Sequence, residues 1–306
     1  MAPPDARGRP STAVGPSASA AASGTAGASA AAGASATAGP SAPSAAAGTT
    51  GATSTGATTP TLAPAAAEDL LRTGRLEVLG RLVAASNVTL LCRISGETPT
   101  EGGTGSEPGV RCIYKPTAGE APLWDFPPGT LARREVAARL VSEASGWGIV
   151  PPTILRDGPY GPGMVQLWLE VDPAVDIVEL VRAGAPVLRP IALFDAVVNN
   201  ADRKAGHLLP LPDGRVCGVD HGVCFSPDPK LRTVLWAWMD APLADEELAV
   251  LRLLRAALDG ALGAGLAELL AAEEVAATAR RIERLLETGR FPVPDPRWPA
   301  IPWPWY

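Results

Sequence analysis

Two basic residue types are scarce in this sequence of 306 residues. Arginine supplies most of the positive charge, and the only lysines are Lys115, Lys204 and Lys230. Histidine occurs twice, as His207 and His221, within one short stretch. Such arginine-rich usage suggests a G+C-rich genome, so each remaining lysine is a candidate for a specific role.

Other absences argue against whole classes of protein. No apolar stretch is long enough to span a bilayer, and the basic start is not followed by a leucine-rich signal core, so we expect a cytoplasmic protein. The net charge of −6 does not provide the basic field that nucleic-acid binding requires. The cysteines have no metal-like CxxC spacing, which predicts buried reduced thiols at Cys92, Cys112, Cys217 and Cys224.

Composition divides the chain into four parts. Residues 1–65 are almost entirely Ala, Gly, Ser, Thr and Pro, without an aromatic side chain, and are predicted to be a disordered tail. We expect residues 66–170 to form a small β-rich lobe and residues 171–290 a mainly helical lobe. Residues 291–306 are rich in Pro and Trp, which excludes a helix, and are expected to pack against the body because exposed tryptophans are costly.

Turn signals and apolar patterns predict the elements of the first lobe. Thr130 is expected to cap a helix that ends at Gly146, and Pro116 is expected to stop the third strand. The predicted helices cover residues 66–73 and 130–145, and the predicted strands cover residues 76–83, 88–94, 110–115, 150–155 and 164–169.

The second lobe is predicted to be helical around one hairpin. This hairpin lies within residues 208–225 and turns at Pro212-Asp213-Gly214. The predicted helices cover residues 175–182, 190–199, 245–258, 262–270 and 272–288. Together the two lobes make an α+β fold.

Two acidic residues in loop-like contexts carry the strongest chemical signal. Asp202 is followed five residues later by His207, and Asp220 opens the turn Asp220-His221-Gly222. Phosphoryl transfer needs one acidic group to orient the attacking hydroxyl and another to hold the metal on the ATP phosphates, and kinases present them in this order. Each motif alone fits a turn cap or a hairpin end equally well. In combination they favour a kinase.

The upstream residues strengthen this interpretation. Lys115 ends a predicted strand, and Glu135 lies one turn into the next helix, where it could orient the lysine toward nucleotide phosphates. A surface lysine and a solvated glutamate are the alternative, which carries less weight in a chain with three lysines. The sequence therefore predicts a two-lobed protein-kinase-like fold, with one helix in its β-rich N-lobe and a mainly helical C-lobe.

Several ordered stretches resemble the phosphatidylinositol 3- and 4-kinase family, especially the type II 4-kinases, and the distantly related HipA-type kinases. More closely, the chain resembles an actinobacterial branch related to them. These stretches are IYKP from Ile113, REVAARLVSEASGWGIVPPT from Arg134, VQLWLE from Val165, FDAVVNNADR from Phe194, and VDHGVCF from Val219. In the fourth, Asp195, Asn200, Asp202 and Arg203 are in register with the family's catalytic helix and loop.

The resemblance implies a role for each matched position. Asp202, Lys115 and Glu135 would be catalytic, and Asp220 with His207 would hold Mg²⁺. Lys204 stands where the lipid 3-kinases have His, and it could instead contact the moving phosphate as a catalytic residue. The adenine and the phosphates of ATP would be bound by Ser86, Asn87, Lys115, Gln166, Leu167, Trp168, Leu169 and Glu170. His207 stands where the family has Asn, and because imidazole is a poorer ligand for Mg²⁺ than a carbonyl oxygen, Mn²⁺ is an alternative.

These residues lead to an expected ATP-dependent phosphotransferase whose acceptor is a protein, lipid or small-molecule hydroxyl. The first alternative is a nucleotide-binding pseudokinase with a regulatory or scaffolding role, and the second is a structural protein without a nucleotide site. Lys230 and Arg232 could bind an anionic head group beside Trp236 and Trp238 at a membrane surface, or both tryptophans could pack into the helical lobe.

Overall fold

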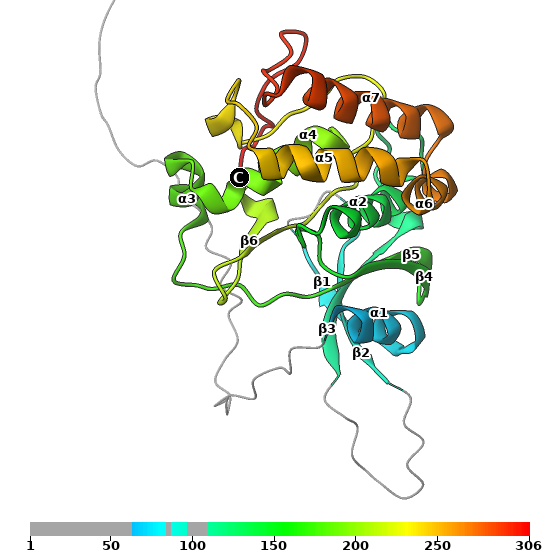
Figure 1. The fold of residues 1–306 in the computed structure, drawn as a ribbon. Helices are drawn as coiled ribbons and strands as arrows, with labels where there is room; N and C mark the ends of the chain where they lie inside the picture. Colours follow the sequence, from blue (N-terminus) through cyan, green and yellow to red (C-terminus); the bar gives the residue numbers. More distant parts are fainter. Residues whose placement is uncertain (1–62, 84–86, 97–108) are drawn as a thin grey trace, which may run out of the picture. The chain divides into compact units, whose positions relative to one another are not determined.

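The computed structural model describes residues 63–83, 87–96 and 109–306, all within one compact unit of residues 57–306. It is a mixed α/β structure in which the described residues form one five-stranded antiparallel sheet, one two-stranded sheet and seven α-helices (Figure 1). None of the described helices has the length and apolarity needed to cross a membrane.

The large sheet has the strand order β1-β2-β3-β5-β4. Its strands are β1 (Arg75–Arg81), β2 (Leu90–Ser95), β3 (Val110–Pro116), β4 (Thr153–Gly158) and β5 (Gly161–Leu167). Side chains alternate between the two faces of a strand, and alternate residues of β2 and β3 are buried in one apolar cluster. Leu71 of helix α1 (Pro64–Thr73) joins this cluster, so α1 covers that face of the sheet.

Tyr114 connects the packing of this face to the position of its neighbour, Lys115. The Tyr114 ring is fully buried, and its hydroxyl donates to the carbonyl of Gly161 at 2.6 Å. A Cβ atom on Gly163 would lie 2.5 Å from the carbonyl oxygen of Lys115 and 2.7 Å from the Tyr114 ring. Because no larger residue fits there, the absence of a side chain at position 163 lets β5 pair closely with the end of β3.

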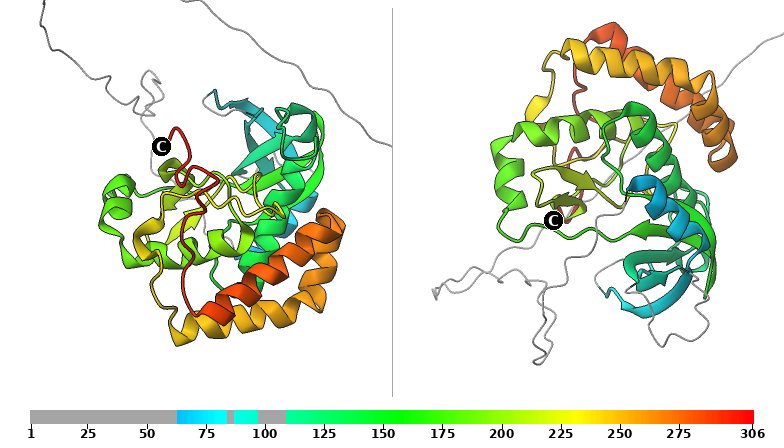
Figure 2. Two further views of the ribbon diagram at one scale, coloured as in Figure 1. Left: turned by 90° about the horizontal axis from the view of Figure 1, so that it is seen from above. Right: turned by 60° about the horizontal axis from the view of Figure 1, so that its bottom comes forward.

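The other helices enclose a second, larger apolar core. They are α2 (Leu131–Ser145), α3 (Ile177–Ala183), α4 (Arg189–Val198), α5 (Asp245–Leu258), α6 (Ala261–Leu269) and α7 (Ala272–Thr288). Helix α2 contacts the sheet on one side and α5 and α6 on the other, and α7 packs on α5 (Figures 1 and 2). A small hairpin of β6 (Leu208–Pro210) and β7 (Val216–Gly218) lies after α4.

Most predicted elements are present, and two local predictions, the start of β4 and the cap of α2, are wrong. Strand β4 begins at Thr153 rather than at residue 150, because Pro151 and Pro152 have no N–H group for the ladder. Strand β3 ends at Pro116, as expected, with Pro116 included as its last residue opposite Gly163. Thr130 makes no side-chain cap on α2. The bounds of α5 and α7 agree with the prediction.

The C-terminal segment, residues 291–306, has no regular secondary structure, as expected. Phe291 and Pro302 are buried, and Trp298 and Trp305 are partly buried. Trp303 contradicts the expectation that all three tryptophans pack against the body, because it is 88% exposed.

Candidate active site

The site is organised around the ammonium group of Lys115, on the face of β3 opposite to Tyr114. Its Nζ lies 2.7 Å from Oε1 of Glu135 and 2.8 Å from Oδ1 of Asp220. Burial alone would lower the pKa of Lys115, but the charges of Asp220 and Glu135 outweigh it and raise that pKa above its ordinary value. Three predicted site residues from distant parts of the sequence are therefore in direct contact.

Helix α2 is fixed at both ends so that Glu135 faces Lys115. Gly146 ends the helix in the left-handed conformation (φ 72°), as predicted. At the other end, the carboxylate of Glu120 accepts hydrogen bonds from the backbone N–H groups of Leu131 (3.2 Å) and Ala132 (2.9 Å). Glu120 thus does what was predicted for Thr130. No sequence pattern marks it, since it lies eleven residues before the helix.

A small pocket opens beside Lys115. Glu135 and Asp220 line it, together with Glu120 and the N-terminus of α2. Asn87 also lines it, and its side-chain oxygen accepts from the N–H of Ala121 at 2.7 Å. Ser86, the other residue predicted to cover nucleotide phosphates, lies outside the described residues.

The predicted adenine-binding segment, residues 166–170, begins with the last two residues of β5 and does not line this pocket. Gln166 is buried, and its side chain donates to Thr153 at 2.9 Å within the sheet. Leu167 pairs with Cys112, three residues from the Lys115–Met164 pair, which places it about 10 Å from Lys115 along the strands.

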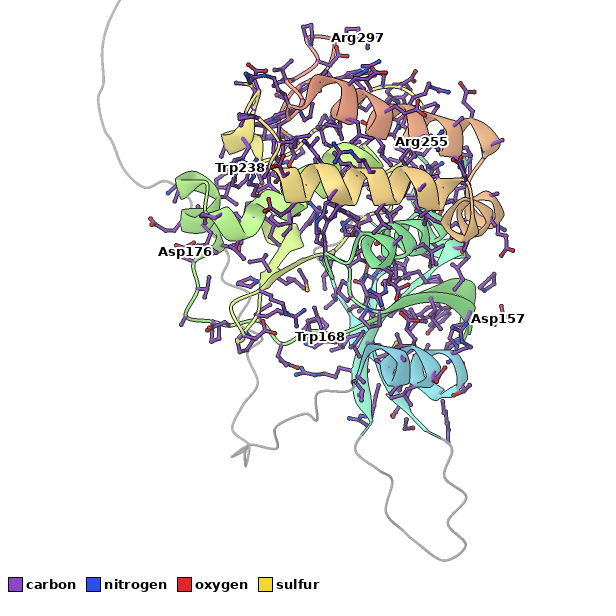
Figure 3. The ribbon with its side chains drawn as sticks, in the orientation of Figure 1. Asp157, Trp168, Asp176, Trp238, Arg255 and Arg297 are labelled. Atoms are coloured by element: carbon purple, nitrogen blue, oxygen red, sulfur yellow. The ribbon has the colours of Figure 1, made fainter. Side chains whose placement is uncertain are left out.

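Trp168 leaves the end of β5 on the segment toward α3 (Figure 3), and its N–H donates to the carbonyl of Arg111 at 3.0 Å. The Arg111 guanidinium lies over its ring at 5.5 Å and also pairs with Glu170. The indole Nε1 of Trp168 is buried without a hydrogen-bond partner. Leu169, which lies between Trp168 and Glu170, is partly buried.

Asp202 lies in the loop after α4 and is paired with Lys204, whose Nζ is 3.2 Å from its Oδ2. The backbone N–H of Asp202 donates to the side chain of Asn200 at 3.0 Å. Burial raises the pKa of Asp202, Lys204 opposes the rise, and the charge of Asp220 adds to it. Asp202 is therefore a partly buried carboxylate with an increased proton affinity.

The same loop is anchored by a fully buried ion pair between Arg203 and Asp195 of α4. Arg203 donates to both Asp195 oxygens, at 2.8 and 2.9 Å, and also lies 2.6 Å from Nε2 of His221. The backbone N–H of His221 in turn donates to Oε2 of Glu135 at 2.9 Å. A continuous set of buried contacts thus connects the loop of Asp202 to the Lys115–Glu135 pair.

Asp220 has a left-handed backbone conformation (φ 62°), which is strained for a residue other than glycine. Lys115 lowers the pKa of its carboxyl group strongly, against the effect of burial. Its Oδ2 lies 3.4 Å from Nε2 of His207. Burial lowers the pKa of His207 to about 4, so the ring is neutral at pH 7.

The contacts of His207 bear on its predicted role as a metal ligand. The backbone N–H of Lys204 points at Nδ1 from 3.5 Å, so the neutral ring carries its proton on Nε2, facing Asp220. No group of three or more His, Cys, Asp or Glu side chains suited to a metal occurs among the described residues. Mg²⁺ is commonly held by one or two carboxylates, waters and substrate phosphates, and the half-exposed Asp220 carboxylate fits that mode.

Lys230, for which an anionic head group was one possible ligand, is buried and paired with Asp125 at 3.1 Å. Trp236 is partly buried and donates from its indole nitrogen to the carbonyl of Ala300 at 2.9 Å. Trp238 packs against the large core beside Phe291 (Figure 3). The two tryptophans therefore pack into the protein, which was the alternative to a membrane surface.

A comparison with known sequences places the chain among relatives. Protein Rv2133c of Mycobacterium tuberculosis is 43% identical over 273 residues, which cover 77% of this chain and 94% of that protein. The chain belongs to the Rv2133c family. Because the relative is an actinobacterial protein, the expected resemblance to an actinobacterial protein is confirmed.

No family model matches the chain. Among solved structures, the proinflammatory kinase CtkA of Helicobacter pylori aligns with a TM-score of 0.42 and 10% identity, covering 72% of this chain and 94% of CtkA.

Proposed function

We propose that this member of the Rv2133c family is an ATP-dependent phosphotransferase with a kinase-like arrangement similar to that of phosphatidylinositol 3- and 4-kinases. The observation that carries the proposal is the position of Lys115, held at 2.7 Å by Glu135 and at 2.8 Å by Asp220 beside an open pocket. A lysine on a strand, a glutamate on the next helix and an aspartate on a later turn are the parts with which kinases hold ATP phosphates.

The charges of the pocket support a requirement for a divalent cation. Three carboxylates, those of Glu120, Glu135 and Asp220, line it beside the single ammonium of Lys115. A polyphosphate would be repelled there unless a cation compensated the negative charge. Mg²⁺ or Mn²⁺ held by Asp220, with help from His207, would neutralise the charge on the phosphates. Leu167 to Glu170 would present their backbone to adenine.

Asp202 is proposed to orient the acceptor hydroxyl. As the new bond from the acceptor oxygen to phosphorus forms and the bond to the leaving ADP oxygen breaks, the hydroxyl proton would pass to Asp202. The raised pKa of its carboxyl group favours this transfer. Lys204, which now pairs with Asp202, would turn to the moving phosphate and leave the carboxylate free. The acceptor is a protein, lipid or small-molecule hydroxyl.

A nucleotide-binding pseudokinase is the second candidate, and two observations favour it. Asp202 is already neutralised by Lys204, and His207 faces Asp220 with its protonated nitrogen rather than with a lone pair. A protein with this site could bind nucleotide without transferring phosphate and act as a regulatory or scaffolding module.

The deciding experiment combines binding and transfer. Melting temperatures are measured with ATP and Mg²⁺ or Mn²⁺, and transfer of radiolabelled phosphate is measured for the wild type, Asp202→Asn and the control Asp213→Asn. Asp213 is an exposed turn residue that pairs only with Arg215 among the described residues. We expect stabilisation in all three proteins and transfer that only Asp202→Asn loses. If nucleotide stabilises the proteins but none of the three, the wild type included, transfers phosphate, the protein is a pseudokinase. If nucleotide stabilises none of them, both candidates are contradicted.

A further inference from the structure

Lys230 is enclosed by side chains from two other segments, so that three parts of the chain that lie far apart in the sequence meet here. Its ammonium lies 4.8 Å from the ring centroid of Trp124, 5.8 Å from that of Phe126 and 5.1 Å from that of Trp298. Asp125 accepts a hydrogen bond from it at 3.1 Å. These four residues around Lys230 are called the Lys230 cage. Aromatic faces attract cations most strongly when water is excluded, and Lys230 is only 4% exposed.

The walls of the cage are not equally firm. Phe126 is buried and is also contacted by the guanidinium of Arg134, at 4.8 Å. Trp124 is 81% exposed and stacks on Trp298 with ring centroids 6.4 Å apart. The outer wall of the cage is therefore the pair of Trp124 and Trp298, which shares the ammonium beneath it.

Each segment of the cage continues into a different part of the candidate active site. Residues 117–130, which carry Trp124, also carry Glu120 at the wall of the pocket. Lys230 itself follows the turn of Asp220. The C-terminal segment continues from Trp298 along the site, where the carbonyl of Ala300 accepts from the N–H of Thr233 at 3.1 Å.

Beyond Ala300, the carbonyl of Trp305 accepts from the N–H of Ala205 at 2.9 Å, three residues after Asp202. The C-terminal segment thus lies against the loop that is proposed to orient the acceptor. An acceptor that approaches Asp202 from this side meets the segment first.

We propose that the Lys230 cage is a latch that holds residues 291–306 across the loop of Asp202, and that opening the latch frees the acceptor side of the site. The second half of this statement rests on the proposed function, and the first half does not. In the closed state the outer tryptophan pair clamps the C-terminal segment, and the hydrogen bonds of Ala300 and Trp305 follow from that clamp.

The test uses two tryptophans of the same segment as a matched pair. Trp298 belongs to the cage, whereas Trp303 is 88% exposed and outside it. Hydrogen exchange is measured at the amides of Ala205 and Thr233 in the full chain without nucleotide. We expect Trp298→Ala to accelerate exchange at both amides by about 3- to 30-fold, the range equivalent to a desolvated cation–π contact. Trp303→Ala should leave the exchange unchanged.

A second variant, Lys230→Met, removes the cation and retains an apolar chain of similar length. It should accelerate exchange at the same two amides, whereas Lys230→Arg should not, because arginine also binds aromatic faces. If the amides of Ala205 and Thr233 exchange in Trp298→Ala at the same rate as in the wild type and in Trp303→Ala, the latch proposal is wrong.

Because exchange is measured without ATP, this outcome does not depend on the proposed function. Faster exchange in Trp298→Ala together with no nucleotide binding by any variant would support the latch and contradict the kinase.

Discussion

Replacing Lys115 by Met tests the central geometry of the site without any ligand. The substitution destabilises Glu135 most, because the Glu135 side chain is only 2% exposed to solvent. Its second carboxylate oxygen has one backbone donor, the N–H of His221. Removing the only ammonium in contact leaves a buried carboxylate without a counter-charge, which costs about 3 kcal/mol. Asp220 is 46% exposed, so water compensates most of its own loss.

The free energy lost at Glu135 sets the expected result. In a domain of this size 1 kcal/mol corresponds to roughly 2–4 °C, so we expect Lys115→Met to lower the melting temperature by about 6–12 °C. Glu135→Gln should cost less, because Lys115 keeps Asp220 as a partner. Adding Glu135→Gln to Lys115→Met should restore part of the loss, since the unpaired buried charge is then gone.

Thermal unfolding followed by circular dichroism measures all four proteins of this cycle. If Lys115→Met has the melting temperature of the wild type, or if the double variant has a lower melting temperature than Lys115→Met, the ion pair between Lys115 and Glu135 does not form in solution. The role assigned to Lys115 would then lose its basis.

Three further predictions use other parts of the structure. Glu120→Ala should lower the free energy of unfolding by about 1 kcal/mol in urea, through loss of the α2 cap, and Glu120→Gln, which keeps an acceptor, should lower it less. None of the four buried thiols should react with a thiol reagent at pH 8 until the protein unfolds, since burial raises the pKa of Cys112 to about 12 and that of Cys92 to about 11. His207→Asn should increase the stabilisation by ATP with Mg²⁺ relative to Mn²⁺; an unchanged ratio would exclude position 207 from metal binding.

Local signals in the sequence were sufficient for most elements of the fold. Helices α5 and α7 have the predicted bounds because apolar residues recur at helical spacing and acidic residues occupy their first turns. The errors occur where a proline or a side chain distant in sequence determines where an element begins or how it is capped. Strand β4 starts late because of two prolines, and the cap of α2 comes from Glu120, which only the tertiary fold brings to the helix.

The site was predictable in its parts but not in its connections. Lysine scarcity and strand position identified Lys115, and helix position identified Glu135. The contacts of Lys230 could not be predicted from the sequence, since Trp124 and Trp298 lie far away from it along the chain. The role of His207 also depends on tertiary contacts, because the N–H of Lys204 decides which ring nitrogen carries the proton.

The contacts of His221 explain how Asp202 and Lys115 can hold a fixed relation without touching. A guanidinium only donates hydrogen bonds, so Arg203 requires a lone pair on Nε2 of His221, and the neutral ring then carries its proton on Nδ1, 3.9 Å from Glu135. Burial and the nearby charge of Arg203 keep the pKa of His221 well below its ordinary value, so this state persists at neutral pH. Arg203 lies next to Asp202 in the chain, and Glu135 holds Lys115. A shift of the Asp202 loop must therefore either break a buried contact of Arg203 or carry the His221 turn, and with it the partner of Lys115, in the same direction.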